Sequence, residues 1–80
     1  MYTLKDIKPN TLVTFKKYNG KSRRITYRTI FITYADLNYD ERFKCDGVSI
    51  RYDYFEGQNY EYLIENDLEK EFDILKIVQF

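Results

Sequence analysis

The side chains that could act on another molecule fall into two groups of opposite charge. Residues 1–28 hold eight Lys or Arg and one acid, a net charge of +7; because the 80-residue chain is neutral, the rest carries −7. Between residues 53 and 73, eight carboxylates accompany only Lys70. Such a division either creates a charged binding surface or brings the two regions together in the fold, where they neutralise each other.

The basic group surrounds one aromatic residue in the region 16–28. A cationic loop that carries a ring can hold phosphates and stack a base, as in small barrels that bind single-stranded nucleic acid. Charged residues on an exposed hairpin also serve simply to keep its edges soluble. Under the first interpretation, the nucleic-acid-binding candidates are Lys16, Lys17, Tyr18, Lys21, Arg23, Arg24 and Arg28.

The acidic group is interleaved with tyrosines at positions 52, 54, 60 and 62. Strand alternation predicts that these tyrosines point inward and the neighbouring acids outward. An outward row of carboxylates can occupy a basic groove in place of phosphates, so the predicted partner is a host protein such as a nucleic-acid enzyme. The predicted contact residues are Asp53, Glu56, Glu61, Glu65, Asp67 and Glu69, with Tyr39 as an anchor in a loop over 36–41. The same acids would equally form an ordinary solvated face.

No constellation of residues indicates catalysis. The chain has no His and one Cys, so the common nucleophile–base pairs and zinc ligand sets cannot be assembled. The acids lack calcium-loop spacing, and each Gly stands alone in a predicted turn rather than in a phosphate-binding run. We therefore predict a non-enzymatic protein without cofactor or metal, in which Cys45 is a small core residue.

Length and composition predict one small domain over residues 1–80. The chain has a mass of 9.8 kDa, and its residues are 44% apolar and 19% aromatic, enough to build a core. No apolar run is long enough to span a membrane, and no leader pattern opens the sequence. The single cysteine fits a reducing compartment, so we predict a cytoplasmic location without membrane contact.

Three predicted hairpins organise the domain. The first joins 12–18 to 23–35 through a three-residue loop at 18–20, which places Val13 opposite Ile25 and puts Phe15, Tyr27 and Phe31 on one face. The second turns at Asp46-Gly47, so that positions 48, 50 and 52 point inward. The third turns over 56–58 and pairs positions 50, 52 and 54 with 64, 62 and 60.

These hairpins predict a mainly β fold: a small antiparallel barrel of five or six strands, partly open, with an SH3-like layout. One helical turn is expected at 3–7, and a second, over 67–72, precedes a last strand at 74–80. The alternative is an α+β domain in which a longer helix at 66–72 packs on one curved sheet.

The resulting functional expectation is a binding protein that blocks its target sterically or electrostatically. Lys, Ile, Asn, Tyr and Phe make up 36 of the 80 residues, a usage typical of AT-rich genomes, so we favour a phage or mobile-element inhibitor or accessory factor acting in a host cell. A nucleic-acid-binding barrel is the alternative. An open barrel also has edge strands that can pair between copies, so a homo-oligomer is a further alternative.

Overall fold

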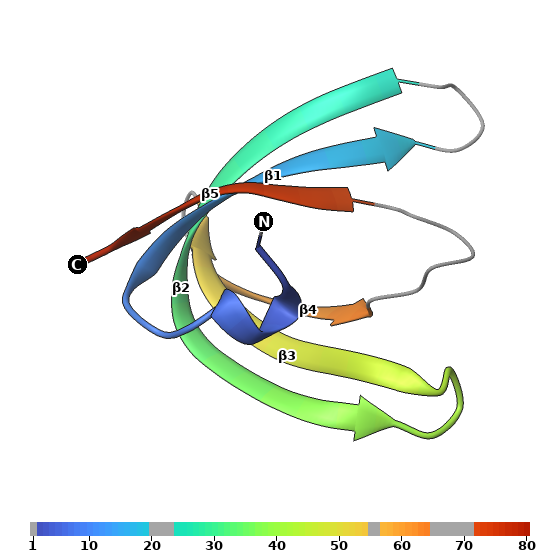
Figure 1. Cartoon of the computed structure of the whole chain (residues 1–80). Coiled ribbons are helices and arrows are strands. Elements are labelled where there is room, and N and C mark those ends of the chain that lie inside the picture. Colours follow the sequence, from blue (N-terminus) through green and yellow to red (C-terminus); the bar gives the residue numbers. More distant parts are fainter. Residues whose placement is uncertain (1, 20–23, 55–56, 65–71) are drawn as a thin grey trace.

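The computed structural model describes residues 2–19, 24–54, 57–64 and 72–80. A 3-10 helix, η1 (Leu4–Asp6), is followed by five strands: β1 (Thr11–Asn19), β2 (Arg24–Asp40), β3 (Cys45–Tyr54), β4 (Gly57–Ile64) and β5 (Phe72–Gln79). All five pair antiparallel in one curved sheet that does not close, in the order β4-β3-β2-β1-β5 (Figure 1). The predicted mainly β class is confirmed, whereas residues 67–71 of the second expected helical turn lie outside the described residues.

The long strand β2 belongs to both halves of the sheet. Its first half pairs with β1, and β1 pairs in turn with β5; its second half pairs with β3. The β2–β3 register shifts between Ile32 and Tyr34, so Thr33 is an extra residue at this point. Such bulges bend and twist a strand, and β2 curves from one half of the molecule to the other (Figure 1).

The core fills the concave side of the sheet. Strands β1, β2 and β3 turn alternate apolar side chains toward it, and β4 and β5 contribute Leu63, Phe72, Ile74 and Ile77. The helix η1 lies across this side, where Leu4 and the following Ile7 join the core (Figure 1). The predicted turn at 3–7 is confirmed as η1, whose start is capped by the Thr3 N–H donating to Asp6 Oδ2 at 2.7 Å. The buried apolar residues are Leu4, Ile7, Val13, Phe15, Ile30, Ile32, Val48, Ile50, Tyr52 and Leu63.

The predicted register of the first hairpin is wrong. Val13 lies opposite Ile30 rather than Ile25, and the connection spans residues 20–23, outside the described residues. The change is an odd number of positions, so it exchanges the two faces of β2: Tyr27 is 65% exposed while Phe15 is buried. The observed register buries two isoleucines of β2 with Val13 and Phe15, whereas the predicted one would have turned both toward water.

The second turn also differs from the prediction. Residues 41–44 form it, and the Asp40 carboxylate stabilises it by accepting the N–H groups of Arg42 and Phe43 at 2.9 and 3.3 Å. Lys44 closes the turn with φ 53°. Residues 36–40 therefore continue β2 rather than forming a loop, while the predicted inward face of β3 at 48, 50 and 52 is confirmed.

Asp46-Gly47 lies inside β3 instead of forming the predicted turn, and Gly47 leaves room there for an aromatic ring. The ring of Tyr62 on β4 packs directly over Gly47, and a Cβ atom there would overlap the phenol. A glycine in a strand often permits this kind of close approach.

The third hairpin pairs Tyr54 with Gly57, three positions from the predicted register. This odd shift turns Tyr60 and Tyr62 outward and Glu61 inward, the reverse of the expected alternation. The observed register places Leu63 against Val48 in the core and Tyr62 over Gly47. Burial of the leucine is the dominant reason, because the predicted register turned it to solvent.

Candidate functional site

The convex side of β2, β3 and β4 carries a row of exposed aromatic rings around one arginine. Tyr34 is paired with Arg51, and Arg51 is paired with Tyr60, so the three side chains form a ladder across the strands. The Arg51 Cζ lies 4.9 Å from the centre of the Tyr34 ring and 5.1 Å from that of Tyr60. Both distances are typical of cation–π contacts, which hold the rings in place although Tyr60 is 69% exposed.

Tyr62 extends this row toward the β2–β3 turn. Its hydroxyl donates to Asp40 Oδ2 at 2.7 Å across β3, passing over Gly47. This hydrogen bond lowers the pKa of Asp40 below its ordinary value and raises that of Tyr62, with burial adding to the rise at Tyr62. Only 8% of the Asp40 side chain is exposed, since it also caps the turn and lies 3.7 Å from Arg42. The Tyr62 ring is therefore held by its packing over Gly47 and by the hydrogen bond of its hydroxyl to Asp40.

Carboxylates border these rings. Asp36 and Asp53 are both exposed and share the convex side with Arg51 according to the strand registers. Asp36 accepts a hydrogen bond from Asn38 at 2.9 Å. We call the set Tyr34, Asp36, Asp40, Arg51, Asp53, Tyr60 and Tyr62 the tyrosine face. Ordered rings with adjacent carboxylates favour contact with cationic side chains of a protein.

A second polar cluster lies on the concave side. Arg28 donates to Glu61 Oε2 at 2.8 Å and to the Tyr52 hydroxyl at 3.4 Å, and its Cζ lies 5.3 Å from the Tyr52 ring centre. Burial alone would lower the pKa of Arg28, but the hydrogen bond and charge of Glu61 outweigh it and raise this pKa. Burial and then the Glu61 charge raise the pKa of Tyr52. The cluster links β2 to β4 across β3, and the charges of Arg28 and Glu61 neutralise each other within it.

The structure describes three residues of the predicted acidic contact set, Tyr39, Asp53 and Glu61, and does not place these three on one surface. Asp53 and Tyr39 are exposed, but register parity places Tyr39 on the concave side of β2 and Asp53 on the convex side of β3. Glu61 is on the concave side, paired with Arg28. Glu56, Glu65, Asp67 and Glu69 lie outside the described residues.

The described residues of the predicted basic set are divided between the two sides of the sheet as well. Lys16 Nζ lies 5.4 Å from the centre of the Tyr18 ring, whose hydroxyl donates to Asp73 at 2.7 Å, while Lys17 and Arg24 are exposed. Arg28 is the cation of the concave pair. Lys21 and Arg23 lie outside the described residues.

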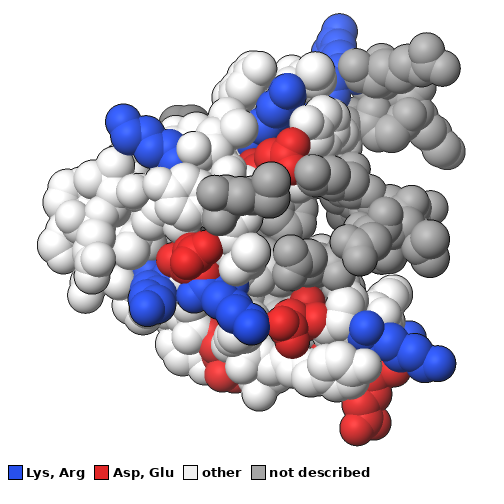
Figure 2. Space-filling model, viewed as in Figure 1, with Lys and Arg blue, Asp and Glu red and all other residues white. Residues whose placement is uncertain are grey.

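Charges of both signs are interspersed on the described surface seen in Figure 2. Within the described ranges, the basic segment contacts the acidic one through the Arg28–Glu61 ion pair and the Tyr18–Asp73 hydrogen bond. Over these residues, the fold brings oppositely charged segments together.

Sequence reasoning missed Tyr34, Asp36, Asp40 and Arg51. Their alignment with the β4 tyrosines depends on the bulge at Thr33 and on the long turn at 41–44. The usable signal was Asp40 itself, because the carboxylate of an Asp at the start of a turn often accepts the backbone N–H two residues further on.

The part of the chain that the structure describes contains no cluster of three or more His, Cys, Asp or Glu side chains that could hold a metal. Nor does any helix in the described ranges have the length and apolarity to cross a membrane. No protein-family model, curated protein or solved structure matches this chain.

Proposed function

We propose that this chain is a non-enzymatic binding domain that engages a protein partner through the tyrosine face. The observation that carries the proposal is the exposed, ordered row of Tyr34, Tyr60 and Tyr62, held by Arg51 and Asp40. Together with the AT-rich residue usage and small size, it supports a phage or mobile-element inhibitor or accessory factor that blocks a host protein in the cytoplasm.

The rings of the tyrosine face are already ordered before a partner binds, which lowers the cost of binding. A tyrosine contributes a large amphipathic surface, and association normally costs about 0.5–1.5 kcal/mol for each side chain that becomes immobilised. Here the fold has already met much of that cost, because the rings of Tyr34 and Tyr60 rest on Arg51 and the Tyr62 hydroxyl is bonded. A partner would therefore meet a surface close to its bound form.

Charge defines the kind of partner. The Arg51 guanidinium lies between two rings, whereas the Asp36 and Asp53 carboxylates at the border are exposed. Such a surface fits a protein segment that carries Lys or Arg beside apolar groups. When this chain covers that segment, the partner's own ligand can no longer reach it. The chain would then block its partner both sterically and electrostatically.

The partner can be captured from a low-GC host lysate, with and without nuclease, and then titrated against purified variants. Asp36→Lys and Asp53→Lys should each weaken binding, by roughly tenfold, because they oppose a cationic partner. Gln79→Lys is the control for a lysine placed elsewhere, since it adds positive charge at an exposed position of β5, outside the face. Unchanged affinity in both Asp variants would discard this face. A captured protein that disappears after nuclease treatment would favour nucleic-acid binding through residues 16–28.

A further inference from the structure

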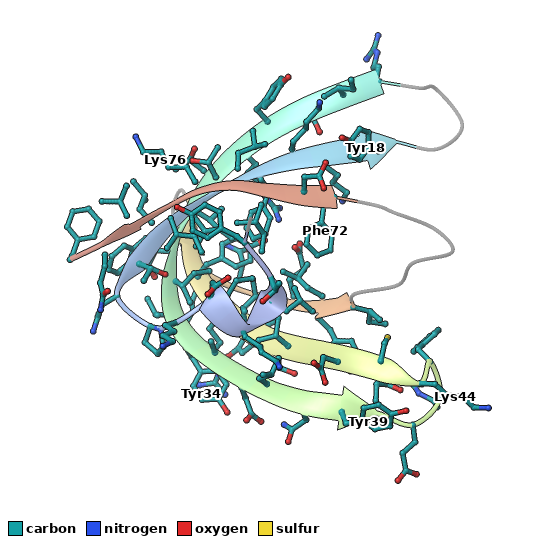
Figure 3. The ribbon with its side chains drawn as sticks, viewed as in Figure 1. Tyr18, Tyr34, Tyr39, Lys44, Phe72 and Lys76 are labelled. Carbon is teal, nitrogen blue, oxygen red and sulfur yellow. The ribbon has the colours of Figure 1, made fainter. Side chains whose placement is uncertain are left out.

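The two edges of the open sheet differ in how they are protected against pairing with another strand. β5 contains Lys76 and is interrupted by a bulge, since Thr14 pairs with Lys76 and Phe15 with Ile74, leaving Leu75 extra. Lysines and bulges are the usual devices that prevent an edge strand from adding a further strand. Figure 3 shows Lys76 projecting from the sheet on the side opposite Phe72.

β4 has none of these protections. It pairs with β3 in one uninterrupted register over all eight residues and contains no Pro or Lys. Its single charge, Glu61, is bound to Arg28 on the concave side. Among the described strands, β4 has β3 as its only neighbour, so it is a regular and nearly neutral edge.

We propose that β4 pairs antiparallel with β4 of a second copy of this chain, forming a two-fold dimer with one continuous sheet of ten strands. A two-fold axis perpendicular to the sheet keeps convex face beside convex face, so each residue must oppose one of the same parity. This condition leaves few registers.

Among the registers centred on Tyr60, Glu61 and Tyr62, the side chains of β4 favour the first. There Tyr60 faces Tyr60 of the second copy, and Asn59 faces Glu61, which pairs an amide with a carboxylate. A register centred on Glu61 would oppose two like charges, and one centred on Tyr62 would set Glu61 against Leu63. Tyr60 is 69% exposed despite its contact with Arg51, so its ring has surface left to cover.

The protected β5 edge explains why assembly stops at two copies. Pairing of β4 with β5 of the next molecule would leave free edges at both ends and continue into a fibre. The bulge and Lys76 disfavour that contact, whereas pairing of β4 with itself uses up the unprotected edge of both copies.

Sedimentation of the purified chain over a range of concentrations tests the proposal in the absence of any binding partner. We expect a dimer of twice the 9.8 kDa chain mass, and its loss in Tyr60→Lys, which brings two cations together at the axis. Tyr34→Lys is the matched control, because Tyr34 contacts the same Arg51 on the same face but belongs to β2, inside the sheet. It should remain dimeric, and circular dichroism verifies that both variants are folded.

The register has its own test. Mixing Tyr60→Lys with Tyr60→Glu should restore a dimer that neither variant forms alone, since residue 60 faces itself only in the proposed register. A native chain that stays monomeric at the highest concentration, a Tyr60→Lys variant that still dimerises, or an unrestored mixture would each overturn the proposal. Because no partner is present, these outcomes leave the proposed function to be judged by its own titration.

Discussion

At the residue scale, single contacts of the tyrosine face connect stability to pH. The bond to Tyr62 keeps the pKa of Asp40 below its ordinary value of 3.8, so Asp40 contributes stability above that pH and loses it as pH falls through the lowered pKa. The pKa of Tyr62 is raised above 10.0, so its contribution is present below that pH and is lost as pH rises through the raised pKa.

Tyr62→Phe should therefore be less stable than the native chain at neutral pH, with the difference shrinking at both extremes. Urea unfolding at several pH values measures this. Tyr60→Phe is the control, because the contact described for Tyr60 is made by its ring and survives loss of the hydroxyl. An equal pH dependence in native chain and Tyr62→Phe would show that the bond to Asp40 is not the source.

Gly47 provides a second test at this scale. Gly47→Ala should displace the Tyr62 ring and destabilise the fold by roughly 1–3 kcal/mol, the usual cost of overpacking. Gly57→Ala meets no atom within 4 Å and should be close to neutral. Denaturant unfolding of the two variants compares them; equal stabilities would mean that the ring moves away at little cost.

At the scale of elements, the Arg28–Glu61 pair ties β4 to β2 over the core. Glu61→Lys should destabilise the chain by about 1–2 kcal/mol, less than for a fully buried pair, because the two side chains are 30% and 28% exposed. Asp53→Lys, in an exposed position of β3, should cost far less. Thermal unfolding distinguishes the two, and equal losses would contradict a structural role for Glu61.

The β2–β3 turn offers a stabilising change. Lys44 has φ 53°, in the left-handed region where glycine carries no Cβ penalty. Lys44→Gly should raise the free energy of unfolding by roughly 0.5–1 kcal/mol, while Lys44→Ala should bring no gain. Chemical denaturation of both variants provides the comparison, and an equal gain from alanine would point to the lysine charge rather than to the backbone.

At the scale of the whole molecule, neutralisation between segments argues against strong phosphate binding. Arg28 is paired with Glu61, and Tyr18 is bonded to Asp73, within the region that would have formed a basic surface. We expect no measurable retardation of single-stranded DNA in gels at physiological salt. Tight binding that weakens steeply with added salt would reverse this expectation and restore the basic hairpin as the functional element.

The sequence by itself determined that this is a small mainly β protein, which strands it has in outline, and which face of β3 is buried. These properties follow from local preferences: β-branched and aromatic runs, and the alternation of Val48, Ile50 and Tyr52. These properties can be predicted from the side chains of each strand alone, without knowledge of its neighbours.

Only the tertiary structure decided the strand registers, and with them the candidate site. The sequence predicted tight turns at 18–20 and at Asp46-Gly47, but burial of Ile30, Ile32 and Leu63 favoured other registers, with the turns displaced. Because side chains alternate along a strand, each odd shift exchanged inward and outward residues, which exposed Tyr60 and Tyr62 and withdrew Glu61. Register depends on the total burial of paired strands, a quantity that no single segment of sequence contains.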